Sequence, residues 1–173
     1  MIKEVLTTYW SQSVLIVLGI SYFVKRIFDS KSKKIEIKYS LFQQHKIVAV
    51  NTFLSNYAKV EFMWHKVPHW DILGNKISVE QTDEMIWPPL YALKQSLFEL
   101  KVYFSGDDHK HFEKLYENFL SLNASLLYAS NDSIHSKNII QNANAFTFLR
   151  DKTFKENNGI INDLTVIIRH SYY

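Results

Sequence analysis

The chain has no cysteine and only four glycines and three prolines among its 173 residues. The absence of thiols excludes disulfides and thiolate metal sites as supports of the fold. The shortage of glycine and proline indicates long, uninterrupted helices. The sequence also shows no glycine-rich phosphate loop, no nucleophile elbow and no pair of carboxylates at a catalytic spacing. We therefore expect neither enzymatic activity nor a cofactor.

The longest stretch without a charged residue is Val5–Val24, and Lys25 and Arg26 follow it directly. A helix of that length, rising about 1.5 Å per residue, spans about 30 Å, the thickness of the hydrocarbon core of a bilayer. A buried core helix would keep a polar stripe, and a cleaved signal peptide would begin with basic residues, whereas this run begins after Lys3 and Glu4. The run predicts one uncleaved transmembrane helix.

The basic residues near this run lie almost entirely on its C-terminal side. Only Lys3 precedes it, and positive charge at the end of a span is retained on the cytoplasmic side. We therefore expect a single-pass protein of the cell inner membrane, with its N-terminus outside and its C-terminal domain in the cytoplasm. Aromatic rings near both ends of the run favour the headgroup zone. The predicted membrane-interface residues are Tyr9, Trp10, Tyr22, Phe23, Lys25, Arg26, Lys31, Lys33 and Lys34.

Charge is unevenly distributed along the chain, although the net charge is only +3. The segment 25–38 carries six basic and two acidic residues, whereas 39–173 carries thirteen basic and fourteen acidic residues. A basic segment beside a membrane is attracted to anionic lipid by about 1 kcal/mol per Lys or Arg. A nucleic-acid-binding domain needs a basic patch on its own surface. The distribution predicts anionic lipid of the inner leaflet as a partner and argues against nucleic acid.

Four polar residues, Thr7, Thr8, Ser11 and Gln12, fall on one stripe of the predicted span. Small hydroxyl side chains let helices approach closely, and a Gln amide in lipid needs a partner. The stripe therefore fits intramembrane association in a homo-oligomer. The same residues also fit the outer headgroup region, with the span shifted inward. The sequence leaves both alternatives open.

Farther along the chain, apolar residues recur at alternating steps of three and four in three segments. This spacing keeps one seam of a helix facing its neighbours and is typical of bundles and coiled coils. Short connections between long helices favour antiparallel neighbours. The sequence predicts an all-α fold, with a membrane anchor and basic segment over 1–30 and an antiparallel cytosolic bundle of about four helices over 31–173. The seam residues are Val50, Phe53, Tyr57, Val60, Trp64 and Val67; Ile86, Leu90, Leu93, Leu97, Leu100 and Phe104; and Phe112, Leu115, Phe119, Leu122 and Leu126.

Local signals predict where the helices of the bundle begin and end. Ser78 and Gln81 form a capping-box pattern. Pro88 and Pro89 should divide their helix into two arms, because both lack an amide donor. Gly106 predicts a tight turn, with one of the two following aspartates capping the next helix. Two further breaks are expected, a polar linker over 130–138 and an interruption at 157–159.

The histidines of the chain do not form a recognisable metal site. His65 and His69 are four apart, but Pro68 lies between them at a predicted helix end. His109 and His111 are two apart, which places them on different faces of a helix. We therefore predict no metal and expect solvated histidines near helix ends.

The tryptophans Trp64, Trp70 and Trp87 fit two interpretations. They can line a ligand pocket, or they can plug the end of the bundle. Core packing is favoured, because large aromatic side chains supply much of the burial in a small bundle.

The stretch TTYWSQSVLIVLGISYFVKRIFD, followed by KSKKIEIKYSLFQQHKI, resembles short bacterial membrane proteins of unassigned function. In these proteins a single span leads into a helical cytosolic domain. The resemblance covers mainly residues 5–60 and implies the same arrangement here. It implies no catalytic or binding residues.

These observations favour a membrane-anchored protein-interaction module, that is, a scaffold, adaptor or regulator without catalytic activity. Its partner would be another protein, bound through an exposed face of the bundle. The alternative is a small membrane effector of a stress or phage-defence system, which oligomerises through its transmembrane helix and perturbs the membrane. The polar stripe at the start of the span motivates that alternative.

Overall fold

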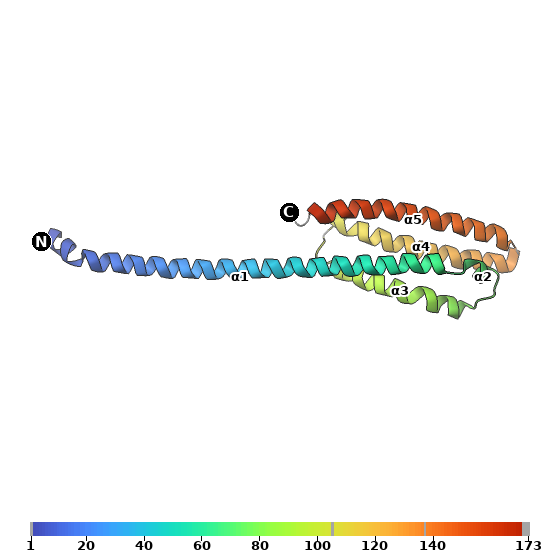
Figure 1. Cartoon of the computed structure of the whole chain (residues 1–173), viewed down its shortest axis with the longest axis horizontal. Coiled ribbons are helices and arrows are strands. Elements are labelled where there is room, and N and C mark those ends of the chain that lie inside the picture. Colours follow the sequence, from blue (N-terminus) through green and yellow to red (C-terminus); the bar gives the residue numbers. More distant parts are fainter. Residues whose placement is uncertain (1, 105, 137, 171–173) are drawn as a thin grey trace. The chain divides into compact units, whose positions relative to one another are not determined.

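The structure is a computed structural model that describes residues 2–104, 106–136 and 138–170; for residues 2–8, 10–19 and 136 it describes the backbone only. Within these ranges all regular structure is helical, without a strand, which confirms the predicted all-α class. Figure 1 shows the order of the elements. The five helices are α1 (Ile2–Lys66), α2 (His69–Leu73), α3 (Val79–Leu100), α4 (Gly106–Ser136) and α5 (Ile139–His170).

The chain divides into two units, Met1–His45 and Lys46–Tyr173. The first unit consists of the N-terminal part of α1, and the second contains the rest of α1 and the other four helices. The division lies after residue 45, whereas the sequence places it after residue 30. The reason is burial: among the described side chains of α1, Lys46 is the first that is buried.

The predicted transmembrane helix is not confirmed. Most of Val5–Val24 falls on residues whose side chains lie outside the described part of the chain, including Trp10 and the polar stripe Thr7, Thr8, Ser11 and Gln12. Among the residues that are described, no helix has a stretch both long enough and apolar enough to cross a bilayer.

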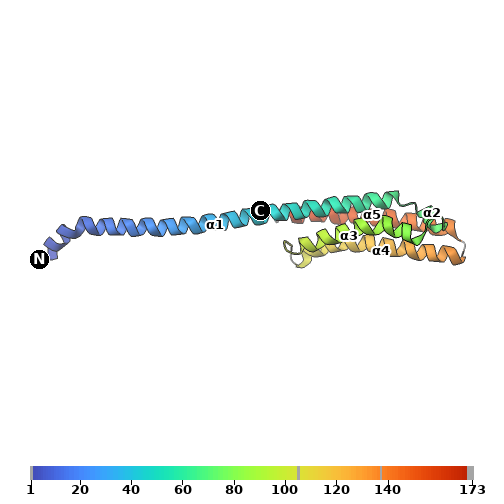
Figure 2. The same ribbon diagram turned by 90° about the horizontal axis from the view of Figure 1, so that it is seen from below.

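In the second unit, the last six turns of α1 pack with α3, α4 and α5 around one core, and successive long helices run in opposite directions (Figures 1 and 2). Every seam residue predicted from the three-and-four spacing is buried, from Val50 in α1 to Leu126 in α4. The spacing identified the core correctly because each long helix turns the same stripe toward its neighbours.

Aromatic pairs join α1 to the other helices at three levels of this core. The rings of Phe53 and Phe112 meet edge to face with their centroids 5.1 Å apart. Tyr57 lies against Phe119 at 5.3 Å, and Trp64 lies near Phe146 at 6.2 Å. Edge-to-face and tilted pairs of this kind contribute about 0.5–1.5 kcal/mol beyond the area they bury.

Helix α3 is one continuous helix, so the predicted division at the two prolines is wrong. Its start is as expected: the Ser78 hydroxyl accepts from the Gln81 amide, and the Gln81 side chain accepts from the Ser78 amide. Pro88 and Pro89 lie inside the helix; Pro88 is exposed and Pro89 is half-buried. The carbonyls they leave without an amide belong to residues 84 and 85, whose side chains are exposed, so water can reach that side of the helix. The buried residues before and after the prolines hold both halves on one core.

The polar segment 130–138 is also mostly helical, because α4 continues to Ser136. Ser133 is buried in it and accepts a hydrogen bond from Asn142 of α5, so polar side chains here face a neighbouring helix. Helix α4 begins at Gly106, whose φ of +49° suits glycine, so the following aspartates Asp107 and Asp108 lie in the first turn.

Helix α5 runs through residues 157–159, where an interruption was predicted. Asn157 is fully buried, and its Oδ1 accepts a hydrogen bond of 2.7 Å from Nδ2 of Asn118 in α4. The nearby Tyr57 is buried too: burial raises its pKa, Glu61 adds to the rise, and the Asn157 amide acts in the opposite direction. A Cβ at Gly159 would meet no atom within 4 Å, so the glycine marks open helix surface.

Candidate functional site

One hollow of the bundle is a groove between the C-terminal half of α4 and the N-terminal half of α5. Its volume is about 230 Å³. The lining is largely apolar, with an acidic residue and an amide among the alanines, Phe146 and Leu149. Ligand pockets for molecules of drug size usually measure about 300–1,000 Å³. The groove is therefore of a size for one or two side chains of a partner. Its lining residues are Ser125, Tyr128, Ala129, Asp132, Asn142, Ala145, Phe146 and Leu149.

Asn142 fixes the polar end of this groove. Its Nδ2 lies 2.8 Å from Oδ2 of Asp132 and 2.9 Å from Oγ of Ser133. These two bonds engage both amide hydrogens and join the start of α5 to the end of α4. The wall of the groove is consequently preorganised rather than formed only on binding.

Two aromatic side chains on the same two helices are strongly exposed. Tyr128 of α4 has 78% of its surface accessible, and Phe148 of α5 has 74%. Tyr128 lines the groove, and tyrosine is among the residue types that most often anchor protein interfaces. Neither the groove nor the two aromatics was predicted from the sequence, because they lie off the core seam and nothing in the spacing distinguishes them from ordinary surface residues.

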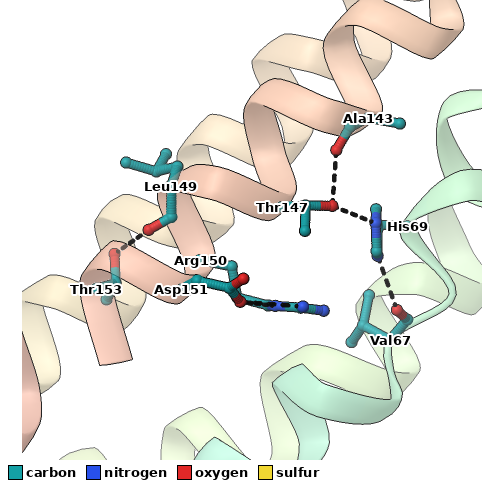
Figure 3. A network of polar contacts seen from close by, with 8 residues as sticks. All are labelled: Val67, His69, Ala143, Thr147, Leu149, Arg150, Asp151 and Thr153. Carbon is teal, nitrogen blue, oxygen red and sulfur yellow. Dashed lines mark hydrogen bonds and ion pairs between the residues drawn. The ribbon is translucent and has the colours of Figure 1, made fainter. Parts of the chain in front are cut away.

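A polar network at the end of the bundle joins α2 to α5 (Figure 3). Nε2 of His69 lies 3.0 Å from the hydroxyl of Thr147, which donates to the carbonyl of Ala143 at 2.9 Å. Because the Thr147 hydrogen is engaged, Nε2 carries a proton and donates, which identifies the tautomer of the neutral ring. Nδ1 is 3.4 Å from the Val67 carbonyl, too far for a strong bond. The network holds the connection between α1 and α3, which contains His69, against α5.

Burial is the main influence on His69 in this network. It lowers the pKa of the imidazole below 6.5; the Val67 carbonyl opposes this shift, and the cationic Arg150 reinforces it. Arg150 is itself paired with its neighbour Asp151, with Nη2 and Oδ1 3.1 Å apart. His69 is therefore a neutral, structural residue rather than the solvated histidine expected from the sequence.

The other predicted histidine and tryptophan positions differ in burial, and His65, exposed in the last turn of α1, agrees with the expectation. The His65 ring lies 4.5 Å from the Phe154 ring, and His109 is buried beside the Leu97 carbonyl. Trp64 is fully buried, whereas Trp70 is exposed, so the expected tryptophan plug is only partly correct. Trp87 is half-buried and packs on the core, and its indole donates to the Asp83 carboxylate at 3.0 Å. Among the described residues, no three His, Cys, Asp or Glu side chains are grouped so that they could hold a metal ion.

A second candidate surface lies on the first unit. One side of α1 gathers Tyr22 with the basic residues Lys25, Arg26, Lys33 and Lys34. The described membrane-interface residues are all exposed, which leaves their charges and rings accessible from solvent; these are Tyr9, Tyr22, Phe23, Lys25, Arg26, Lys31, Lys33 and Lys34.

Comparisons with protein-family models, with curated protein sequences and with solved structures gave no significant match. The resemblance to short bacterial membrane proteins therefore stays a prediction.

Proposed function

We propose that this chain is a membrane-anchored protein-interaction module, a scaffold, adaptor or regulator with no catalytic activity of its own. The α4–α5 groove is the observation that carries this proposal. It is small, apolar and preorganised, and it lies beside an exposed aromatic residue, Tyr128. An interface core is typically apolar and aromatic with a polar rim, and this groove combines those elements.

The proposed partner is another protein that inserts one or two side chains into the groove. An apolar side chain would meet Phe146 and Leu149, and a basic or hydrogen-bonding group would meet Asp132 at the polar end. Asp132 accepts from Asn142, which holds its carboxylate in place at this end of the groove.

Capture of binding partners tests whether the groove is the binding face. The full chain is used to capture them from a mild-detergent extract of native membranes. Ala145→Arg places a long cation inside the groove, whereas Ala124→Arg places the same side chain on an exposed position of α4 outside it. We expect a reproducible partner that is retained by the wild type and by Ala124→Arg and lost by Ala145→Arg. A partner retained equally by both variants, or by a chain without the bundle, contradicts the groove as the binding face.

Attachment to the membrane is the second part of the proposal. The exposed cluster of Lys25, Arg26, Lys33 and Lys34 supports it, since each basic residue near an anionic leaflet contributes about 1 kcal/mol. The exposed rings of Tyr22 and Phe23 have the amphipathic character that favours the headgroup zone. With the span preceding the basic cluster, the N-terminus would lie outside the inner membrane and the bundle in the cytoplasm.

Two experiments distinguish attachment through the basic surface from a membrane span: flotation with vesicles and extraction at alkaline pH. Binding to vesicles of neutral and anionic lipid, compared with a variant carrying glutamine at the four basic positions, tests the basic surface. Retention in the membrane pellet at alkaline pH tests the span, because a chain held only by charge is released. Full release at alkaline pH with charge-dependent flotation would contradict the span and keep the surface attachment.

A membrane effector that oligomerises through Thr7, Thr8, Ser11 and Gln12 stays the alternative function. The side chains of that stripe lie outside the described residues, so it gains no structural support here. Toxicity on overexpression with membrane depolarisation, abolished by Ser11→Leu with Gln12→Leu, would favour it over the adaptor.

A further inference from the structure

The first unit carries an apolar stripe on the exposed surface of α1. Phe28, Ile35 and Phe42 follow one another at intervals of seven residues. Tyr39 comes four residues after Ile35 and three before Phe42, so it lies on the same side of the helix. All four are exposed, Phe28 and Ile35 each with 68% of their surface accessible. An interval of seven places these residues on the same face of a helix, which is the spacing of a two-stranded coiled coil.

The charges beside this stripe differ in sign from one flank to the other. With Phe28, Ile35 and Phe42 at the d positions of a heptad, Lys31 and Lys38 occupy g positions, and Asp29 and Glu36 occupy e positions. The residues at g and e border the apolar seam and meet the flanks of a partner helix. All the acidic residues of the segment 25–38 therefore lie on one flank of the stripe.

We infer that this stripe, hereafter the heptad stripe (Phe28, Ile35, Tyr39 and Phe42), binds a second copy of the same chain as a parallel, in-register coiled coil. In a parallel pair, a g residue faces the e residue five positions later on the partner helix. Lys31 of each chain then faces Glu36 of the other, which gives two opposite-charge contacts across the seam. In an antiparallel pair, g faces g and e faces e, which would place lysines against lysines and acids against acids.

A lipid surface fits the heptad stripe less well than a second copy. An interfacial helix that lies on anionic lipid has basic residues bordering its apolar face. Here one border is acidic, with Asp29 and Glu36. The strongest basic cluster, with Arg26 and Lys33, lies on another side of the helix, together with Tyr22. The pairing of two copies therefore leaves Arg26 and Lys33 accessible, and the inference does not depend on attachment to a membrane.

The absence of cysteine makes site-directed crosslinking a clean test, because any introduced thiol is the only one in the chain. Ser32 lies at an a position of the proposed coiled coil, beside Phe28 and Ile35, so Ser32→Cys brings two thiols together across the seam. Ser30→Cys, the matched control, lies at the f position on the opposite side of the helix. Mild oxidation of cells that express the full chain should give a disulfide-linked dimer with the first variant and little with the second.

Reversal of the flanking charges tests the orientation independently. In the Ser32→Cys background, Lys31→Glu or Glu36→Lys alone places like charges across the seam, and we expect about fivefold less crosslinked dimer. The two reversals together restore opposite charges, and we expect the yield to return. Equal crosslinking at positions 30 and 32, no crosslinking at either, or failure of the double reversal would each overturn the parallel pairing. Flotation of the same variants with vesicles reports separately on membrane attachment.

Discussion

Replacement of both prolines in α3 by alanine should stabilise the bundle substantially. The two residues lie ten and eleven positions into the helix, so their missing amides would otherwise bond to the carbonyls of Glu84 and Met85. Proline in a helix interior costs about 3 kcal/mol relative to alanine. The gain in folding stability on replacement by alanine is smaller than this. Alanine makes the unfolded chain more flexible than proline does, which lowers the stability by about 0.4–1 kcal/mol. Each site should therefore contribute about 2 kcal/mol.

Little packing is lost in the exchange, since Pro88 is exposed and Pro89 is only half-buried. The two sites are neighbours, so their effects on stability are not simply additive. We expect the double variant to be more stable than the wild type by about 2–4 kcal/mol. For a unit of this size the midpoint of thermal unfolding should rise by about 10 °C. Hydrogen exchange should show the gain most clearly in the amides that follow residue 84.

The assay is thermal and urea unfolding followed by circular dichroism, with Gln95→Ala as control. Gln95 is an exposed position of the same helix, so its replacement should change stability by less than about 0.5 kcal/mol. An unchanged or lower midpoint for the double variant would refute the reasoning. It would mean that the carbonyls before the prolines are already satisfied, or that the prolines fix a backbone geometry on which the core depends.

Three further predictions concern the core, a histidine and a cap. Phe119→Ala should destabilise the bundle by about 3–5 kcal/mol, because a fully buried ring next to Tyr57 is lost; a cost below 1 kcal/mol in urea unfolding would show that the site collapses easily. The pKa of His69 is lowered by burial, so the unfolded chain binds a proton at higher pH than the folded one, and stability should fall as the pH drops below about 6.5. His69→Gln should reduce that pH dependence, measured as the difference in urea midpoint between pH 7.5 and 5.5, whereas an unchanged difference would assign it elsewhere. Ser78→Ala should cost about 1 kcal/mol through loss of the capping box with Gln81, unlike Ser125→Ala on the surface of α4.

The sequence predicted the core of the bundle far better than its surface. Core residues such as Phe53, Leu93 and Phe119 are specified by spacing alone, because a helix in a bundle must turn one stripe inward. The capping box at Ser78 was equally legible, since its two hydrogen bonds are local. Both kinds of signal depend on neighbours within a few residues along the chain.

The errors arose where a tertiary contact decides the outcome. Asn157 looks like a helix breaker in sequence, but its Oδ1 accepts a hydrogen bond from Asn118 on another helix. Ser133 looks like part of a linker, yet it is buried against Asn142. The α4–α5 groove escaped notice for the same reason, because its lining comes from two helices and no single segment contains its pattern.

The hydrogen bond between Asn118 of α4 and the buried Asn157 of α5 has a consequence for how these helices can align. If α5 slid along α4 by one helical turn, about 5.4 Å, Asn157 would leave Asn118 and bring its amide against apolar side chains. An unpaired buried amide costs about 1–3 kcal/mol, and Asn118 would lose its acceptor as well. A core of leucine and phenylalanine alone would tolerate such a slip, because one apolar layer resembles the next. The pair thus acts as a register mark, and it keeps the Asn142 wall opposite α4 in the single alignment that forms the groove.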